Sequence, residues 1–186
     1  MGGERAGRAR RAESGIVAFS EWPMDKQTTP KHPWLGLIVI LVLCFAAAGI
    51  GGAVTTPKIA TWYATLAKPT WNPPNWIFGP VWSALYFCMA VAAWLKWRQG
   101  GVGQARVPLA LFAVQLALNV LWSYIFFGLE MPGLAFADVL LLWAAIAGTM
   151  VMFWRQSKIA GILFVPYLVW VSFASVLNFA IWRLNM

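Results

Sequence analysis

The sequence predicts an all-α fold, an integral membrane bundle of five transmembrane helices. Of the 186 residues, 61% are hydrophobic and only 11% are charged, whereas soluble domains carry about 25% charged residues. The apolar residues also gather into long runs, and a helix of about 20 predominantly apolar residues is enough to cross a bilayer. Five runs reach this length, at roughly 34–54, 77–95, 107–127, 133–153 and 160–182.

Residues 1–33 differ from the domain that follows them at 34–186. They are polar and arginine-containing, with no apolar period, and we predict a disordered basic N-terminal extension. They do not resemble a cleaved signal peptide, because the apolar run after them is long enough to span the membrane. Met24 offers an alternative start, MDKQTTPKHPW, close to the first span. The extension is therefore either a real tail or a stretch upstream of the true start.

The basic residues are distributed unequally between the two ends of the predicted helices. The N-terminal segment and the second and fourth gaps hold eleven of the 14 lysines and arginines. Lys58, Lys68 and Arg183 make up the other side. Because positive residues favour the cytoplasmic side, we predict a multi-pass protein whose N-terminus is cytoplasmic if the membrane is a plasma membrane. The charges form no continuous face of the kind that binds nucleic acid, so no nucleic-acid partner is expected.

The connections between the runs predict how the helices meet. The first run ends in small residues that would let helices approach closely: Ala48, Gly49, Gly51, Gly52 and Ala53. The longest gap, 55–76, is rich in aromatic residues and has enough apolar mass to fold over the bundle as a lid. Pro73 and Pro74 keep the end of this gap out of a helix. The short turns at 100–103 and 128–132 predict antiparallel neighbours.

Conventional catalytic and metal sites are not predicted. His32 is the single histidine, which excludes a multi-histidine metal site, a Ser–His pair and histidine ligation of haem within the bundle. Cys44 and Cys88 lie in predicted spans, where cysteine commonly acts as a small buried hydrophobe. Glu130 and Asp138 are the acidic residues after the extension, and they form no paired-carboxylate site. We expect no metal and no required cofactor.

Nine of the 13 tryptophans fall into two groups by their position in the predicted spans. At span ends, where the indole anchors at headgroup depth, lie Trp34, Trp94, Trp97, Trp154 and Trp182. Within spans lie Trp82, Trp122, Trp143 and Trp170. An indole N–H within a span needs a partner or a polar ligand, although packing in the core or against lipid is the alternative for each of these four.

Polar residues inside the spans indicate which helix faces meet a cavity. Two such faces can be drawn at helical spacing: Gln115, Asn119 and Trp122 in the third span, and Pro166, Trp170, Ala174 and Asn178 in the fifth. Intramembrane polar groups tend to face a bundle interior or a cavity, and hydrogen bonding between helices is the alternative for the amides. Asp138 either faces the interior or lies near the interface, where loop amides would satisfy it.

Three long motifs resemble one known family, in the right order along the chain. They are WYATLAKPTWNPPNWIFGPVW at 62–82, QLALNVLWSYIFFG at 115–128 and VPYLVWVSFASVLNFAIWRLN at 165–185. They are similar to the TspO/MBR family, which includes tryptophan-rich sensory proteins, translocator proteins and the peripheral-type benzodiazepine receptor. The resemblance implies a five-helix membrane bundle, commonly a homodimer, that binds porphyrins and haem and, in animals, cholesterol and benzodiazepine-type ligands.

The resemblance also implies a ligand-binding set, which falls on Tyr63, Pro73, Phe78, Trp82, Tyr86, Asn119, Trp122, Trp170 and Ala174. The expected function is a membrane receptor or carrier that binds tetrapyrroles (protoporphyrin IX, haem) in an aromatic cavity, in tetrapyrrole regulation or transport and stress sensing. The propionate groups of the bound tetrapyrrole would reach toward Lys58 or Lys68. One alternative is a light- and oxygen-dependent porphyrin-degrading enzyme, in which Trp82 and Trp170 would be catalytic.

A second alternative is a sterol- or lipid-binding membrane scaffold. The animal cholesterol-recognition stretch matches 176–183, but Phe179 stands where that pattern has tyrosine, and the pattern is weak even when complete. A homodimer would use a face of small residues, either Ala110, Ala113 and Ala117 on the third span or Ala48 and Gly52 on the first. Family precedent favours the third span.

Removing residues 1–23 should leave membrane insertion and ligand binding intact. The segment has no apolar face, and Lys26 and Lys31 still place positive charge beside the first span. The measurement is the yield of folded, membrane-extracted protein from a chain that starts at Met24. Loss of folded protein would contradict the prediction.

Overall fold

The computed structural model describes residues 32–99 and 101–186. The predictions for residues 1–31, including their disorder and the alternative start at Met24, lie outside the described residues. The described part contains five helices long and apolar enough to cross a membrane, and no strand. They are α2 (Pro33–Ile59), α4 (Phe78–Arg98), α5 (Gly101–Ser123), α6 (Pro132–Gln156) and α7 (Lys158–Leu184). The predicted fold class is therefore confirmed, with each helix somewhat longer than its apolar run.

The helix ends follow from local sequence. Pro33 and Pro132 stand in the first turns of α2 and α6, where a missing backbone N–H costs nothing and the proline φ angle suits a helix. Ser157 alone separates α6 from α7, and its side chain accepts a hydrogen bond from the Ala160 amide at 3.3 Å. A connection of one residue makes α6 and α7 antiparallel neighbours.

The long connection between α2 and α4 forms a structured lid, which we define as residues 60–74. It contains the short helix α3 (Trp62–Thr65) and leads into the 3₁₀ turn η3 (Asn75–Ile77). α2 continues through Pro57 to Ile59, so the lid begins later than the predicted loop. Pro73 and Pro74 lie in extended chain before η3, as proline requires.

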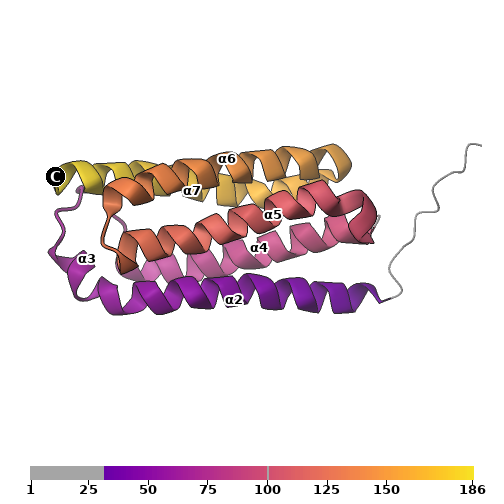
Figure 1. Ribbon diagram of the computed structural model, residues 1–186, viewed down its shortest axis with the longest axis horizontal. Helices are drawn as coiled ribbons and strands as arrows, with labels where there is room; N and C mark the ends of the chain where they lie inside the picture. The colour runs from indigo at the N-terminus through magenta and orange to yellow at the C-terminus, as the bar shows by residue number, and fades with distance from the viewer. Residues whose placement is uncertain (1–31, 100) are drawn as a thin grey trace, which may run out of the picture.

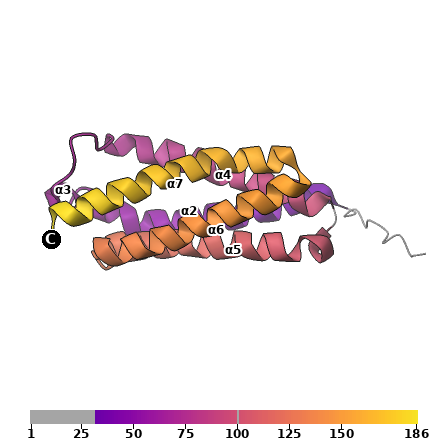
Figure 2. The ribbon, with the colours of Figure 1, turned by 90° about the horizontal axis from the view of Figure 1, so that it is seen from above.

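The five long helices run side by side along the long axis of the molecule (Figure 1). α2 contacts α4 and α5, α4 contacts α7, α7 packs along α6, and α6 packs on α5, which closes a ring of neighbours. The C-terminus lies at the same end of the bundle as α3 in both views (Figures 1 and 2). The lid and the end of α7 are thereby neighbours, although they are far apart in sequence.

A dense core fills the end of the bundle away from the lid. Its members come from all five helices and include Cys44, Met89, Phe153, Phe164 and Tyr167, each 0% exposed. Around the lid, a second cluster gathers aromatic side chains of the lid and of the end of α5. Between these two clusters the helices are not fully packed, and there the cavity described below lies.

The pattern of small residues at the end of the first span predicted close helix contact. The glycines of this stretch differ in whether they provide it. Gly51 is buried, and a Cβ placed on it would lie 3.1 Å from the Ser123 Oγ of α5. A Cβ on Gly49 or Gly52 would meet no atom within 4 Å. Gly51 therefore allows close approach, whereas the other two glycines border open space.

The turn between α6 and α7 depends on the absence of a side chain at Gly161. A Cβ there would lie 2.8 Å from the Cα and 2.6 Å from the Cε3 of Trp154. Replacement Gly161→Ala should lower stability by about 1–3 kcal/mol through overpacking. Thermal unfolding in one detergent measures this, with Gly49→Ala as the matched control, because its added methyl group meets open space. Equal midpoints for the two variants would contradict the prediction.

Candidate functional site

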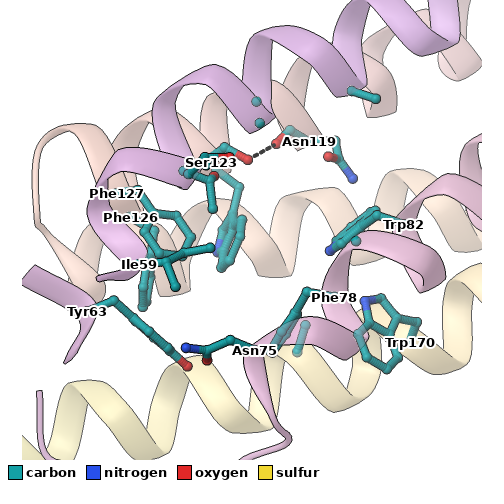
Figure 3. Close-up of a pocket in the computed structure, with 18 of the residues that line it drawn as sticks. Ile59, Tyr63, Asn75, Phe78, Trp82, Asn119, Ser123, Phe126, Phe127 and Trp170 are labelled. Carbon is teal, nitrogen blue, oxygen red and sulfur yellow. Dashed lines mark hydrogen bonds between the residues drawn. The ribbon is translucent and has the colours of Figure 1, made fainter. Parts of the chain in front are cut away.

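A cavity of about 320 Å³ lies inside the bundle at the lid end. It is bounded by α2, α4, α5, α7 and the lid, and Figure 3 shows its labelled side chains facing a common space. Thr56, Asn75, Gly79 and Ser83 line it and are also exposed, so it opens to the surface between α2 and the start of α4. This volume lies at the lower end of the range of about 300–1,000 Å³ for small-molecule sites.

Aromatic rings form most of the cavity wall. Trp82 and Phe78 come from α4, Trp122 from α5 and Trp170 from α7. Phe78 meets Trp170 edge to face at a centroid distance of 5.9 Å, and Trp122 stacks on Phe126 at 5.1 Å. Rings that hold each other in this way present flat apolar faces in fixed positions. Such a wall suits a flat, largely apolar ligand.

A chain of hydrogen bonds forms the floor of the cavity. The Tyr86 hydroxyl donates to Asn119 Oδ1 at 2.8 Å, and Asn119 Nδ2 donates to the Tyr167 hydroxyl at 2.8 Å. The Tyr167 hydroxyl then donates to Gln115 Oε1 at 2.9 Å. Tyr86 and Asn119 line the cavity, whereas the other two lie deeper and are fully buried. The chain joins α4, α5 and α7 and fixes the orientation of the Asn119 amide.

The indole N–H groups at the cavity differ in whether they have partners. Trp122 Nε1 donates to Asn178 Oδ1 at 2.9 Å, and Asn178 Nδ2 donates to the Pro132 carbonyl at 2.8 Å. Trp170 Nε1 is buried and has no hydrogen-bond partner in the described part of the chain. A buried N–H without a partner is costly, so Trp170 Nε1 is an unsatisfied donor in the wall of the cavity.

The lid closes the cavity with Tyr63, which is 4% exposed. Its ring lies 5.7 Å from that of Phe127, and its hydroxyl donates to Asn72 Oδ1 at 3.0 Å. Burial raises the pKa of the Tyr63 phenol above its ordinary value, and the hydrogen bond to Asn72 lowers the pKa in part. The Lys68 ammonium lies 4.8 Å above the Tyr63 ring. The positive charge of Lys68 is thus held against the ring that closes the cavity.

The two lysines expected near an acidic ligand differ in their surroundings. Lys58 Nζ forms an ion pair with Glu130 Oε1 at 2.7 Å, which ties the end of α2 to the turn before α6. Lys68 Nζ donates to the carbonyl of Leu66 at 2.8 Å, within the lid. Glu130 has a positive φ of 58° at that turn. Glu130 therefore partly offsets the positive charge of Lys58, whereas Lys68 supplies positive charge at the lid.

The structure brings together eight of the nine residues of the predicted ligand-binding set. The residues that line the cavity are Tyr63, Phe78, Trp82, Tyr86, Asn119, Trp122, Trp170 and Ala174. Pro73 does not line it and lies in the lid, partly buried. Whether these side chains bind a ligand remains a prediction, because a shared cavity is a matter of geometry alone.

Two further sequence interpretations are decided by position. Trp143, one of the tryptophans within spans, is 40% exposed on the outside of α6, and its Nε1 donates to the Ser172 hydroxyl at 2.8 Å. It therefore takes no part in the cavity. Asp138 is 6% exposed, with no partner for Oδ2 in the described part of the chain, and it does not line the cavity.

Several cavity residues were not predicted from the sequence. Phe126 and Phe127 both line the cavity because α5 ends in a π-helix, η4 (Tyr124–Gly128), closed by a bond from the Leu129 amide to the Tyr124 carbonyl at 2.9 Å. Such wide turns often occur at functional sites but leave no periodic signal. Gly52 and Gly79 also line the cavity, and open space lies where their side chains would be. They contribute to the cavity because they lack a side chain.

The structure offers no metal site in the residues it describes, since these contain no group of three histidine, cysteine or acidic side chains able to hold a metal ion. Both cysteines, Cys44 and Cys88, are free. The described site is accordingly one of aromatic faces, amides and hydroxyl groups.

Five apolar helices of spanning length, four of which line an aromatic cavity, define a multi-pass integral membrane protein. The model of the TspO/MBR family matches residues 31–183, and the chain belongs to this family. It is 47% identical to the tryptophan-rich protein TspO of Chlorobaculum tepidum, over 80% of this chain and 97% of the relative. It is 39% identical to the human translocator protein, over 82% of this chain and 92% of the relative. It is also 43% identical to a tryptophan-rich sensory protein of Cereibacter sphaeroides, over 82% and 92%.

Replacement Asn119→Ala should destabilise the bundle by about 1–3 kcal/mol, because it leaves the buried Tyr86 hydroxyl without its acceptor and removes the donor to the Tyr167 hydroxyl, which keeps its bond to Gln115. Ser83→Ala serves as the control, since Ser83 lines the same cavity but bonds only to the Gly79 carbonyl of its own helix. Thermal unfolding of both variants in the same detergent tests this. An unchanged midpoint for Asn119→Ala would show that the chain of hydrogen bonds contributes nothing.

Proposed function

We propose that the protein is a membrane receptor or carrier for a flat tetrapyrrole such as protoporphyrin IX or haem. The observation that carries the proposal is an aromatic cavity whose wall includes Trp170, a residue whose buried indole N–H has no partner among the described residues. Binding sites for apolar ligands combine apolar walls with a few placed polar groups. Relatives named translocator and tryptophan-rich sensory proteins are consistent with such a role.

The bound tetrapyrrole would lie against the faces of Trp82, Trp122 and Trp170. A macrocycle larger than the enclosed cavity of about 320 Å³ must project through the opening between α2 and α4. Its propionate groups would then remain in the polar region at the lid, near Lys68. The single histidine, His32, stands at the start of α2, at the other end from the lid, so haem would be held by stacking and not by histidine ligation.

We also propose that the lid faces away from the cytoplasm in a plasma membrane. Lys96, Arg98, Arg106, Arg155 and Lys158 lie at or near the helix ends opposite the lid, and cytoplasmic ends are enriched in such residues. Assembly into a homodimer would use α5, where Ala110, Ala113 and Ala117 are exposed on the outer surface. Small residues of this kind permit close packing between helices in lipid.

Enzymatic breakdown of the porphyrin is the competing proposal, with Trp82 and Trp170 supplying electrons. Both tryptophans line the cavity, so geometry is compatible with either function. Purified protein loaded with protoporphyrin IX is illuminated in air, and its absorption spectrum is followed. A new product that disappears in the Trp82→Phe and Trp170→Phe variants would favour the enzyme, whereas an unchanged spectrum favours the receptor or carrier.

Replacement Trp170→Ala should weaken protoporphyrin IX binding about tenfold or more. Stacking of a base on an aromatic side chain is worth about 1–3 kcal/mol, and about 1.4 kcal/mol corresponds to one decade in Kd. Trp154→Ala is the control, because Trp154 is 44% exposed at the end of α6, remote from the cavity lining. Quenching of tryptophan fluorescence during a porphyrin titration measures both affinities.

Replacement Trp170→Phe separates stacking from hydrogen bonding. It keeps an aromatic face but removes the N–H, and we expect a loss of affinity intermediate between that of the wild type and Trp170→Ala. Equal losses for Trp170→Ala and Trp154→Ala, in proteins of equal thermal stability, would mean that the tryptophans act only through folding. The cavity would then not be the porphyrin site.

A further inference from the structure

The lid is joined to the end of α7 by one side chain, that of Asn185. The Ala67 amide donates to Asn185 Oδ1 at 2.9 Å, and Asn185 Nδ2 donates back to the Ala67 carbonyl at 2.9 Å. The same Nδ2 donates to the Ile181 carbonyl of α7 at 2.7 Å. A carboxamide that pairs with both the N–H and the C=O of one residue imitates a backbone partner. The two residues are 118 positions apart.

The remaining polar contacts of the lid do not reach across the bundle. Within the residues that the structure describes, the Tyr63 hydroxyl bonds to Asn72 of the lid, Lys68 bonds to lid carbonyls, and the Thr61 hydroxyl bonds to Pro57 of α2. The other links between lid and bundle are apolar and mostly aromatic, such as Trp71 against Phe173 at 5.9 Å. Aromatic contacts can slide, whereas paired hydrogen bonds define one position.

We infer that Asn185 is a positioning residue that latches the lid over the cavity and thereby sets the rate at which a ligand enters and leaves. This inference deepens the proposed function and, for its ligand part, rests on it. Ile181 lines the cavity one helical turn before Asn185, so the latch connects the cavity wall directly to the lid. When the pair opens, Ala67 loses its polar tie to α7, and the lid keeps the apolar packing of Tyr63 and Leu66 on the bundle.

The latch itself can be tested on the ligand-free protein by hydrogen exchange of the Ala67 amide. Two hydrogen bonds of ordinary net strength hold this pair, and removing both should raise the open population about tenfold. The Asn185→Ala variant should therefore exchange the Ala67 N–H about ten times faster than the wild type. Leu184→Ala is the matched control, since Leu184 lies in the same turn, is 52% exposed, and forms no hydrogen bond to the lid.

A lid-side variant separates the latch from simple fraying of α7. Ala67→Pro removes the amide donor and leaves α7 unchanged, and the extended Leu66 (φ −67°, ψ 141°) suits a residue before proline. Protoporphyrin IX release, followed by stopped-flow recovery of tryptophan fluorescence, should be several-fold faster in both Asn185→Ala and Ala67→Pro. The double variant should be no faster than Asn185→Ala, because both changes break one interaction.

The outcomes separate the latch from the proposed function. Unchanged exchange of the Ala67 amide in Asn185→Ala would overturn the latch, whatever the ligand does. Faster exchange with unchanged porphyrin release would overturn its control of ligand passage. If no porphyrin binds to the wild type, the proposed function fails, and the exchange measurement alone still decides whether Asn185 holds the lid.

Discussion

Hydrogen bonds between side chains of α4, α5 and α7 are the interaction on which the site depends. Lipid tails are as apolar as the helix surfaces, so apolar burial alone does not favour helix contact over lipid contact. A polar group left without a partner in the membrane is costly, and the chain from Tyr86 through Asn119 and Tyr167 to Gln115 satisfies each group in one arrangement of the helices. That arrangement holds Trp82 of α4 and Trp170 of α7 in the wall of the same cavity.

The cavity exists because two glycines beside it carry no side chain and because a π-helix changes the direction of two phenylalanine rings. Gly52 and Gly79 leave space between α2 and α4, and the π-helix at the end of α5 turns Phe126 and Phe127 together toward that space. The stacked and edge-to-face contacts among the rings then keep the wall rigid. A rigid aromatic space that opens to the surface would suit the flat tetrapyrrole that we propose as its ligand.

Closure of the cavity is assigned to a segment less firmly held than the helices. The lid combines a buried aromatic anchor, Tyr63, with a polar connection to the far side of the bundle, which in the described residues is made by Asn185 at the end of α7. Elements that move in ligand binding are commonly drawn from the less stable parts of a fold. The ion pair of Lys58 and Glu130 meanwhile fixes the end of α2, from which the lid departs. A firm wall and a releasable cover would suit the receptor or carrier role that we propose.

The sequence by itself determined the five spans, because bilayer thickness sets the length of an apolar run. Helical spacing placed Asn119, Trp122, Trp170 and Ala174 on interior faces, and the family resemblance added Tyr63, Phe78, Trp82 and Tyr86; all eight line one cavity. Tertiary structure alone decided that Trp143 faces outward, that Pro73 does not line the cavity, and that Asn185 meets Ala67. The reason is physical: periodicity shows which residues share a helix face, but the partner opposite that face is chosen by packing between distant segments.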